Sequence, residues 1–171
     1  VFNQICVGIA RNAAAVYGAI GAKEVHYSHY RDEDLDELTE LLGDEPTKQD
    51  VLIWNLFSKK RLLDIVKNFV IYEKAKGSTI KKLPRYQQLR ATNKAIDKLK
   101  HKDEGGVIWH TQGSGKSITM TYISKKLQAE ENGFNNPTIL ILTDRIDLDT
   151  QISDLFVNTG FQNVHRARGV R

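Results

Sequence analysis

The feature that most constrains this chain is the segment Gly106-Val-Ile-Trp-His-Thr-Gln-Gly-Ser-Gly-Lys-Ser117, in which an apolar run leads into a glycine-rich loop. The pattern from Ile118 to Leu127 is helical, so the predicted order is strand, loop, helix. Gly113 and Gly115 permit positive φ angles, which let backbone N–H groups turn inward around an anion. The start of the helix adds free N–H groups and a partial positive charge. The segment therefore predicts a phosphate-binding loop.

Two loop side chains have expected roles in binding a nucleoside triphosphate. We expect Lys116 to place its ammonium group on the β- and γ-phosphates, and Ser117 Oγ to ligate Mg²⁺. The strict loop pattern has glycine five residues before Gly115, whereas this chain has His110 there. We expect His110 to pack beside the loop and Trp109 to lie in the core. A glycine-rich turn that binds nothing stays open as the alternative.

The sequence on both sides of the loop alternates between helix and strand. Pro84 precedes a helical stretch that ends near Lys102, and Gly106–Trp109 has the composition of a short buried strand. The run Thr138-Ile-Leu-Ile-Leu-Thr143 is the strongest predicted strand, and Asp147–Phe156 is again helical. Alternation at this spacing predicts an α/β fold with a parallel sheet.

The first part of the chain has a different pattern. We expect short strands from Val1 to about Tyr30 and helices from Arg31 to about Lys82. Gly43 is a predicted helix stop, after the helically spaced Leu35, Leu38, Leu41 and Leu42. Thr47 and Asp50 approximate a capping box, and Ser58 is a second predicted N-cap. We expect Lys74–Lys82, which contains Gly77 and Ser78, to be an exposed linker.

Composition excludes several classes of protein. The chain has 171 residues with 40% hydrophobic and 27% charged residues, as in ordinary globular domains. One cysteine, Cys6, can form neither an internal disulfide nor a usual zinc cluster, so a reducing cytoplasm is the expected compartment. No apolar run is long enough for a membrane helix. The first residue is Val1 and the single methionine is Met120, so we expect a segment of a longer polypeptide.

The net charge of +4 conceals a separation of charge along the chain. Residues 32–50 carry nine carboxylates against one lysine, and residues 59–102 carry fourteen Lys or Arg against three carboxylates. Such a basic block is a plausible footprint for nucleic-acid phosphates. Solvated helix faces or pairing with the acidic block explain it equally well.

Three motifs in order resemble the first motor lobe of superfamily-two helicases and translocases: Pro84-Arg-Tyr-Gln-Gln-Leu-Arg-Ala91, the loop segment, and Leu140-Ile-Leu-Thr-Asp-Arg-Ile-Asp-Leu-Asp-Thr-Gln-Ile152. They resemble most closely the restriction (R, motor) subunit of type I restriction-modification enzymes. The opening Phe2-Asn-Gln-Ile-Cys-Val-Gly-Ile-Ala10 resembles the part of that subunit where its nuclease domain ends. The resemblance covers nearly the whole chain.

The resemblance implies roles for particular residues. It assigns Gln88 to the adenine edge with Arg85 and Tyr86 shaping that pocket, although Gln87 competes for the role of Gln88. It assigns the triphosphate, with Mg²⁺, to the seven loop residues, which are Thr111, Gln112, Gly113, Ser114, Gly115, Lys116 and Ser117. It places Thr143, Asp144, Arg145 and Gln151 near the tracked DNA strand. For Arg145, an ion pair with Asp147 or Asp149 is an open alternative.

The resemblance also implies a domain organisation and partners. Residues 1–45 would end the nuclease domain, 46–82 would be a helical connector, and 83–171 would begin a RecA-like motor lobe with a parallel sheet. The whole subunit would be an ATP-dependent double-stranded DNA translocase and endonuclease that works with methylation and specificity subunits. We expect the nuclease metal ligands and the second acidic motor motif to lie outside this sequence, and this segment by itself to be inactive. The acidic residues Asp32, Glu33, Asp34 and Glu37 are expected to form a solvated face, and His26 and His29 a surface pair.

Two other functions remain open from the sequence. The chain could be a non-catalytic DNA-binding module in which the basic block grips the DNA backbone and the phosphate loop is vestigial. A small-molecule kinase is disfavoured, because no second substrate motif is evident.

Overall fold

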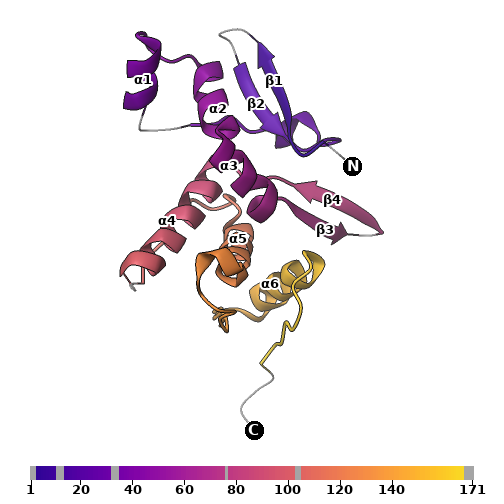
Figure 1. Cartoon of the computed structure of the whole chain (residues 1–171). Helices are drawn as coiled ribbons and strands as arrows, with labels where there is room; N and C mark the ends of the chain where they lie inside the picture. Colours follow the sequence, from indigo (N-terminus) through magenta and orange to yellow (C-terminus); the bar gives the residue numbers. More distant parts are fainter. Residues whose placement is uncertain (1–2, 11–13, 32–34, 76, 103–104, 168–171) are drawn as a thin grey trace. The chain divides into compact units, whose positions relative to one another are not determined.

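The computed structural model of the chain describes residues 3–10, 14–31, 35–75, 77–102 and 105–167. The described residues form α-helices, short helical turns and two two-stranded sheets, so the fold is mixed α/β (Figure 1). The chain divides into two compact units, each made of two separate stretches. The first is Val1–Val70 with Lys81–Leu89, and the second is Ile71–Ile80 with Arg90–Arg171.

An antiparallel hairpin opens the first unit. Strand β1 (Cys6–Ala10) pairs with β2 (Ala14–Gly18) in a register that runs from Cys6 opposite Gly18 to Ala10 opposite Ala14. A Cβ atom at Gly18 would lie 2.9 Å from the ring of Tyr27, so only glycine fits under that ring. The short strands predicted in the first thirty residues are confirmed for these two segments.

The helices of the first unit begin and end largely where the sequence predicts. α1 (Asp36–Leu42) stops at Gly43, whose φ of 74° is the left-handed conformation that glycine adopts at little cost. α2 (Lys48–Phe57) begins with the predicted capping box of Thr47 and Asp50. α3 (Lys59–Asp64) follows and continues into a π-helical turn, Ile65–Phe69. Ser58 stands before α3 as predicted, but its side chain makes no capping hydrogen bond, so that part of the prediction is wrong.

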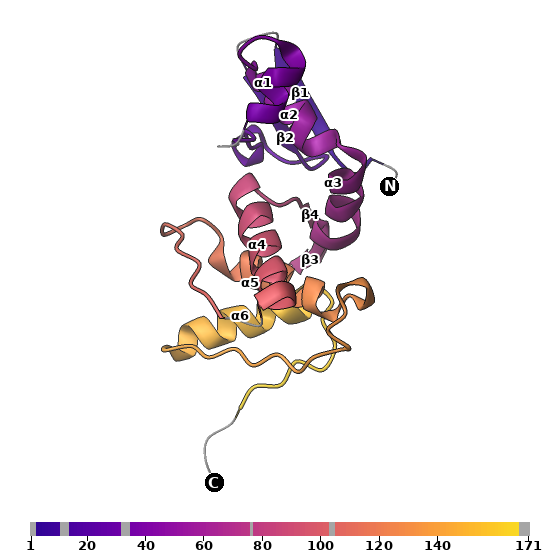
Figure 2. The same ribbon diagram turned by 60° about the vertical axis from the view of Figure 1, so that its left-hand side comes forward.

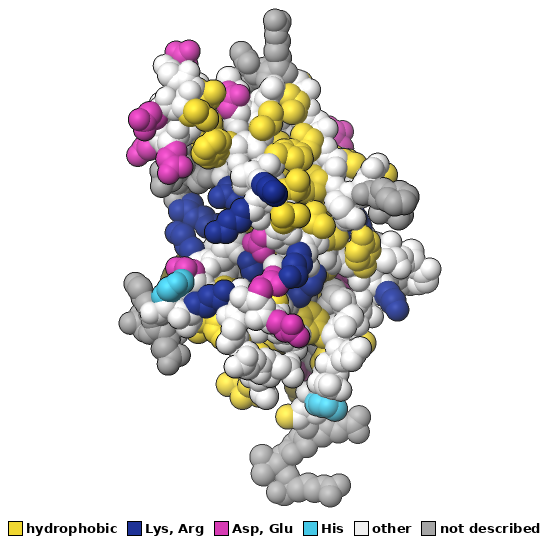
Figure 3. Space-filling model, viewed as in Figure 1, with side chains coloured by type: hydrophobic (Ala, Val, Ile, Leu, Met, Phe, Trp, Pro, Cys, Tyr) yellow, Lys and Arg dark blue, Asp and Glu magenta, His cyan; other side chains and the backbone are white. Residues whose placement is uncertain are grey.

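The core of the first unit lies between these helices and β2. α2 packs on β2 and on α3. The fully or almost fully buried apolar side chains include Tyr17, Leu38, Leu52, Leu56, Ile65 and Phe69. The acidic side chains of α1, by contrast, gather at the surface on the face shown in Figure 3. This agrees with the solvated acidic face predicted for Glu37; Asp32, Glu33 and Asp34 lie outside the described residues.

A second hairpin, β3 (Ile71–Ala75) and β4 (Ser78–Lys82), replaces the predicted exposed linker at residues 74–82. Its strands run in opposite directions (Figure 1). Gly77, with φ of 79°, supplies the turn, and the β-branched Ile71, Thr79 and Ile80 suit the strands. Gly77 and Ser78 favoured the prediction of a linker, but the residues on both sides have high β propensity and form strands.

Three longer helices build the second unit (Figure 2): α4 (Tyr86–Lys102), whose first turn belongs to the first unit, α5 (Lys116–Gln128) and α6 (Ile146–Asn158). A 3-10 turn, Glu130–Asn132, follows α5. α6 packs on α5 and on β3, and Ile96, Tyr122, Ile152 and Phe156 are buried. The helices predicted at 84–102, 118–127 and 147–156 are confirmed.

The two strands predicted on either side of α5 do not form in the described part of the chain. Gly106–Trp109 and Thr138–Thr143 are drawn as plain trace in Figure 2, without a ladder partner. Trp109 is 91% exposed and Leu142 is 85% exposed, so the prediction that Trp109 lies in the core is wrong. A buried parallel strand depends on neighbours that it meets only through tertiary contacts. The described residues thus contain no parallel sheet.

No helix among the described residues combines the length and the apolar character needed to cross a membrane.

Candidate phosphate-binding site

The loop before α5 is curled by its glycines. Gly113 has a φ of 77° and Gly115 a φ of 82°. A Cβ atom at Gly113 would meet nothing within 4 Å, so the glycine there serves the backbone conformation rather than space. Gly115 is the N-cap residue of α5, and its carbonyl oxygen accepts the first helical hydrogen bond, from Thr119 N at 3.0 Å. The predicted positive φ angles are therefore present where the loop meets the helix.

Lys116 folds back over this loop. Its Nζ donates to the carbonyl oxygen of Thr111 at 2.8 Å, and Ser114 N donates to the same oxygen at 3.4 Å. The lysine side chain is exposed, whereas Ser114 is buried. One carbonyl oxygen thus holds the ammonium group at the mouth of the loop, where an anionic ligand could replace it as the lysine's partner.

The start of α5 suits a negative charge. The helix has thirteen residues, and its first turn contains no acidic side chain and no side-chain cap. Its last turn carries Lys125 and Lys126, which complement the negative end of the helix dipole. Burial lowers the pKa of Lys125. The first N–H groups of any α-helix need partners from outside the helix, and here the N-cap offers no side chain to supply one.

The far end of α5 is anchored to its neighbours. Lys126 is buried, and its Nζ donates to Asn93 Oδ1 on α4 at 2.7 Å. Asn132 Nδ2 donates to the carbonyl oxygen of Lys126 at 2.7 Å, and Lys100 Nζ donates to Asn132 Oδ1 at 2.6 Å. These contacts fix the helix whose start forms the loop. No local sequence signal predicts this anchor, because Asn93 and Lys126 are 33 residues apart.

The remaining loop residues lie on the same short stretch. Thr111 and Gln112 are exposed, and Ser117 is half-buried in the first turn of α5. Ser117 follows Lys116 directly and lies in the first turn of α5, the position at which the Mg²⁺ ligand is expected. Chemically, the loop fits a phosphate group: it joins two positive-φ glycines, an uncapped helix start and an ammonium group.

His110 immediately precedes the loop and is half-buried. Its Nδ1 atom is buried and has no hydrogen-bond partner within the part of the chain that the structure describes. The prediction that His110 packs beside the loop is consistent with this burial.

The residues assigned to the adenine edge stand at the start of α4, in the first unit. Arg85 is exposed, while Tyr86 and Gln87 are half-buried. Gln88 is only 4% exposed, and its Oε1 accepts from Arg85 N at 2.9 Å. Gln88 therefore caps the start of α4, a role that its place in the motif does not predict. The phosphate loop belongs to the second unit.

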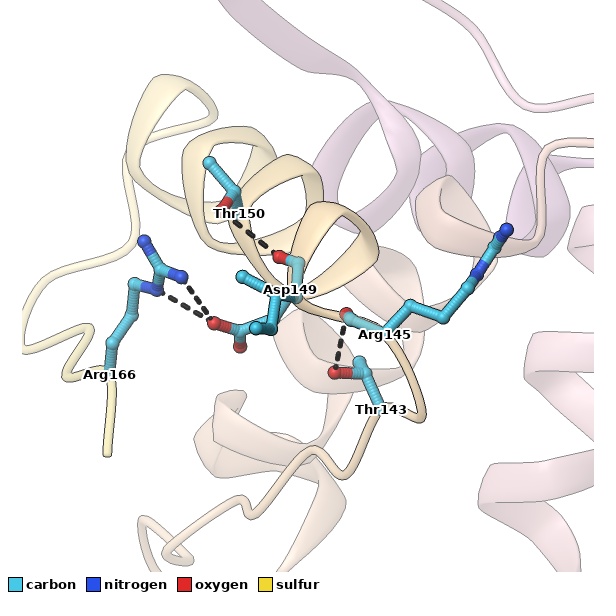
Figure 4. A network of polar contacts seen from close by, with 6 residues as sticks. Thr143, Arg145, Asp149, Thr150 and Arg166 are labelled. Atoms are coloured by element: carbon cyan, nitrogen blue, oxygen red, sulfur yellow. Dashed lines mark hydrogen bonds and ion pairs between the residues drawn. The ribbon is translucent and has the colours of Figure 1, made fainter. Parts of the chain in front are cut away.

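Thr143 and Arg145, two of the residues expected near DNA, lie just before α6 (Figure 4), and Gln151 lies within that helix. Arg145 is the N-cap residue of α6, and its carbonyl oxygen accepts from Asp149 N at 3.0 Å. Thr143 Oγ1 donates to the same oxygen at 3.5 Å. Asp144 and Gln151 are exposed.

The ion pair considered for Arg145 does not form with Asp149. Arg166 takes that place, with its Nε and an Nη atom both 2.7 Å from Asp149 Oδ2. Figure 4 shows the Arg145 side chain extending away from this pair. Arg145 is exposed and its guanidinium has no ion-pair partner among the residues placed in the structure. Its charge is consequently available to an external anion.

No group of three His, Cys, Asp or Glu side chains that could hold a metal ion occurs within the described ranges. His29 Nδ1 lies 3.1 Å from the carbonyl oxygen of Ala15, which gives that histidine a structural contact in the first unit. His26 and His29 are both exposed, which agrees with the surface pair expected for them.

Comparison with known proteins identifies similar sequences. Residues 87–171 match the family described as SWI2/SNF2 ATPase. The chain is 35% identical over 163 residues to the type I restriction enzyme HindI endonuclease subunit of Haemophilus influenzae, covering 91% of this chain and 15% of that protein. It is 33% identical over 137 residues to the putative type I restriction enzyme MjaIXP endonuclease subunit of Methanocaldococcus jannaschii, covering 75% of this chain and 12% of that protein.

A third relative, the putative MjaVIIIP endonuclease subunit of the same archaeon, is 37% identical over 116 residues, covering 63% of this chain and 11% of that protein. The chain therefore spans about a seventh or less of the length of these curated relatives. No solved structure matches the chain.

Proposed function

Because this chain belongs to the family of type I restriction enzyme endonuclease subunits, we propose that it provides the ATP-binding part of a DNA-translocating motor. The observation that carries the proposal is the curled loop of residues 111–117 at the uncapped start of α5, with the Lys116 ammonium group at its mouth. Such a loop binds phosphate through backbone N–H groups, the helix dipole and one positive charge.

In this proposal the triphosphate lies against the loop from Thr111 to Ser117. Lys116 exchanges the Thr111 carbonyl oxygen for the β- and γ-phosphates, and its charge stabilises the transferred phosphoryl group. Ser117 Oγ would ligate Mg²⁺, which supplies further positive charge to the phosphates when bound. The adenine edge is assigned to Gln88, with Arg85 and Tyr86, by the motif order that the chain shares with the family.

The free guanidinium group of Arg145 supports the assignment of Thr143, Arg145 and Gln151 to the tracked DNA strand. An exposed cation whose carboxylate neighbour Asp149 is already paired with Arg166 can contact a DNA phosphate without first breaking an ion pair. The contact would hold the backbone of the strand without reading its sequence.

The domain organisation that we propose follows the family. Residues 1–45 end a nuclease domain, 46–82 connect it, and 83–171 begin a RecA-like lobe. In such a lobe, Gly106–Trp109 and Thr138–Thr143 would both be strands of a parallel sheet, which their apolar composition suits. The whole subunit would use ATP to translocate double-stranded DNA and cleave it, together with methylation and specificity subunits.

Calorimetric titration of the chain with ATP and with inorganic tripolyphosphate, each in the presence of Mg²⁺, tests the proposal. Lys116→Ala should weaken the binding of both by about 100-fold, because charge-assisted hydrogen bonds to phosphate are among the strongest that a side chain makes. Lys94→Ala, which removes an exposed lysine of α4, is the matched control and should leave binding unchanged. Ser117→Ala should weaken binding only when Mg²⁺ is present.

The alternative function, a DNA-binding module with a vestigial loop, predicts a different result in these titrations. Its basic block lies on α3, the β3–β4 hairpin and α4. If DNA binding falls steeply with salt while neither ATP nor tripolyphosphate binds, the module is correct and the motor proposal is wrong.

A further inference from the structure

We propose that Tyr17 and Tyr30 are positioning residues for base recognition, because they hold the segment Pro84–Gln88 in place from the first hairpin. The inference rests on the proposed function, in which this segment contacts the adenine base. Beyond the proposed function, the inference is that the preference for adenine over other bases depends on two N-terminal side chains that are far from this segment in sequence. All the residues involved lie in the first compact unit.

The first contact is a buried hydrogen bond. Tyr17 Oη donates to the carbonyl oxygen of Pro84 at 2.8 Å, across 67 residues of sequence. Tyr17 is 2% exposed and Pro84 is fully buried. Pro84 immediately precedes Arg85, whose carbonyl oxygen accepts the first hydrogen bonds of α4 from Gln88 N and Leu89 N. The bond therefore fixes the backbone at the point where the base-contacting turn begins.

The second contact is a row of three aromatic rings. The centroids of Tyr17 and Tyr30 are 6.3 Å apart, and those of Tyr30 and Tyr86 are 6.2 Å apart, both in tilted arrangements. Aromatic pairs at such distances attract each other beyond the burial of their surface. Tyr86, one of the residues assigned to the base, is thus oriented by Tyr30.

The hairpin is a firm support for both contacts. Tyr17 pairs with Val7 in the β1–β2 ladder and forms a bridge with Ser28, in which Tyr17 N donates to Ser28 O and Ser28 N to Tyr17 O, each at 2.9 Å. A further tie lies nearby in sequence: Lys81 Nζ donates to Asn3 O at 2.7 Å and to Gln4 Oε1 at 2.8 Å. Backbone pairing on two sides fixes the Cα position of Tyr17, and burial restricts the movement of its side chain.

The geometry of the supported turn explains why position matters there. The Oε1 of Gln88 caps Arg85 N, so the side chains of residues 85–88 are arranged around the first turn of α4. A displacement of about 1 Å is enough to weaken an interaction that depends on exact positioning. Loosening the turn should therefore reduce base preference while phosphate binding at a separate loop is retained.

The test compares three ligands on the full chain: ATP, GTP and inorganic tripolyphosphate. Tyr17→Phe keeps the ring and removes only the hydroxyl donor, and Tyr30→Leu removes the middle ring of the row. Each should reduce the ratio of the GTP to the ATP dissociation constant by about fivefold, the usual effect of one hydrogen bond or aromatic pair. Binding of tripolyphosphate should stay within twofold of the unchanged chain.

The matched control is Tyr27→Phe, at another tyrosine of the same region that is not part of the row and packs over Gly18. It should leave the ratio unchanged. A purely structural defect would lower the folded fraction and weaken all three ligands equally, so the ratio separates positioning from stability. Thermal melting of each variant measures stability directly.

The possible outcomes are distinct. An unchanged ratio in Tyr17→Phe and Tyr30→Leu overturns the inference, as does a wild-type chain that binds tripolyphosphate through Lys116 but does not prefer ATP to GTP. In both cases the phosphate site stands. Failure of the wild-type chain to bind tripolyphosphate overturns the proposed function and this inference with it.

Discussion

The first N–H groups of every α-helix need partners from outside the helix, and the starts of α2 and α5 differ in how they provide them. At α2 the side chains of Thr47 and Asp50 provide them. Thr47 Oγ1 and Thr47 N both donate to Asp50 Oδ2, at 2.6 and 2.9 Å. In return, Asp50 N donates to Thr47 Oγ1 at 3.3 Å. α5 begins at a glycine in the left-handed conformation, without a side-chain cap and without an acidic residue in its first turn. Lys116 brings a positive charge to that end.

The difference separates a helix start that stabilises itself from one that we propose binds a ligand. A capping box satisfies two N–H groups and places a carboxylate at the positive end of the dipole, so it leaves little for an external anion. At α5 no side-chain cap and no first-turn carboxylate is present, so in our proposal a phosphate takes their place. The capping box of α2 contributes to stability, whereas α5 lacks that contribution.

The largest expected effect comes from making α5 resemble α2. Gly115→Asp places a carboxylate at the uncapped start and strains a residue whose φ is 82°. Repulsion of the phosphates and distortion of the loop together should weaken tripolyphosphate binding by about 100-fold, measured by calorimetry. Gly43→Asp, at a φ of 74° after α1, is the control for backbone strain and should cost stability without affecting binding. Equal binding by both variants would contradict the comparison.

A smaller effect is expected at the closed start. Thr47→Ala removes the capping hydroxyl of α2 and should lower the free energy of unfolding of the first unit by about 1 kcal/mol. Urea titration in a Trp109→Phe background isolates the signal of Trp54, which lies on α2. Tripolyphosphate binding should not change. A loss of binding as large as that of Gly115→Asp would show that the two helix starts are not independent.

The smallest effect concerns pH. The hydrogen bond from the Thr47 hydroxyl, and then that from Thr47 N–H, lowers the pKa of Asp50 below its ordinary value of 3.8. A lowered pKa in the folded state means that Asp50 stabilises the fold fully above pH 3.8, and that this contribution is lost as the pH falls through the folded-state pKa. The difference in urea midpoint between the wild-type chain and Asp50→Asn should be constant from pH 7 to about 5 and shrink below about 4. A difference that grows on acidification would contradict the sign.

Local signals predicted most helix boundaries. Gly43 ends α1, the Thr47–Asp50 pair opens α2, and Pro84 precedes α4, because each signal acts within one turn of backbone. Ser58 is the exception among the caps, since its side chain makes no capping bond even though its carbonyl oxygen accepts from Leu62 N.

Strands were predicted less well, and the errors have one cause. β1 and β2, which are not strongly apolar, form a ladder across a short connection. The more apolar Thr138–Thr143 forms no ladder within the described residues. Along that run, half-buried residues alternate with exposed ones, as in a strand with one uncovered face. Apolar composition shows that a segment can be a buried strand, but pairing requires a neighbour that local sequence does not specify.

In the candidate site, too, local features were predictable from the sequence and long-range contacts were not. The sequence by itself determined the glycine-rich turn of residues 111–117 and the start of α5, because glycine conformations and a helix terminus act within a few consecutive residues. Only the tertiary structure decided that Tyr17 holds Pro84, that Lys126 anchors to Asn93, and that Arg166 rather than Arg145 pairs with Asp149. Those contacts join residues that are 17 to 67 positions apart, and their partners are selected by packing, for which no short sequence pattern exists.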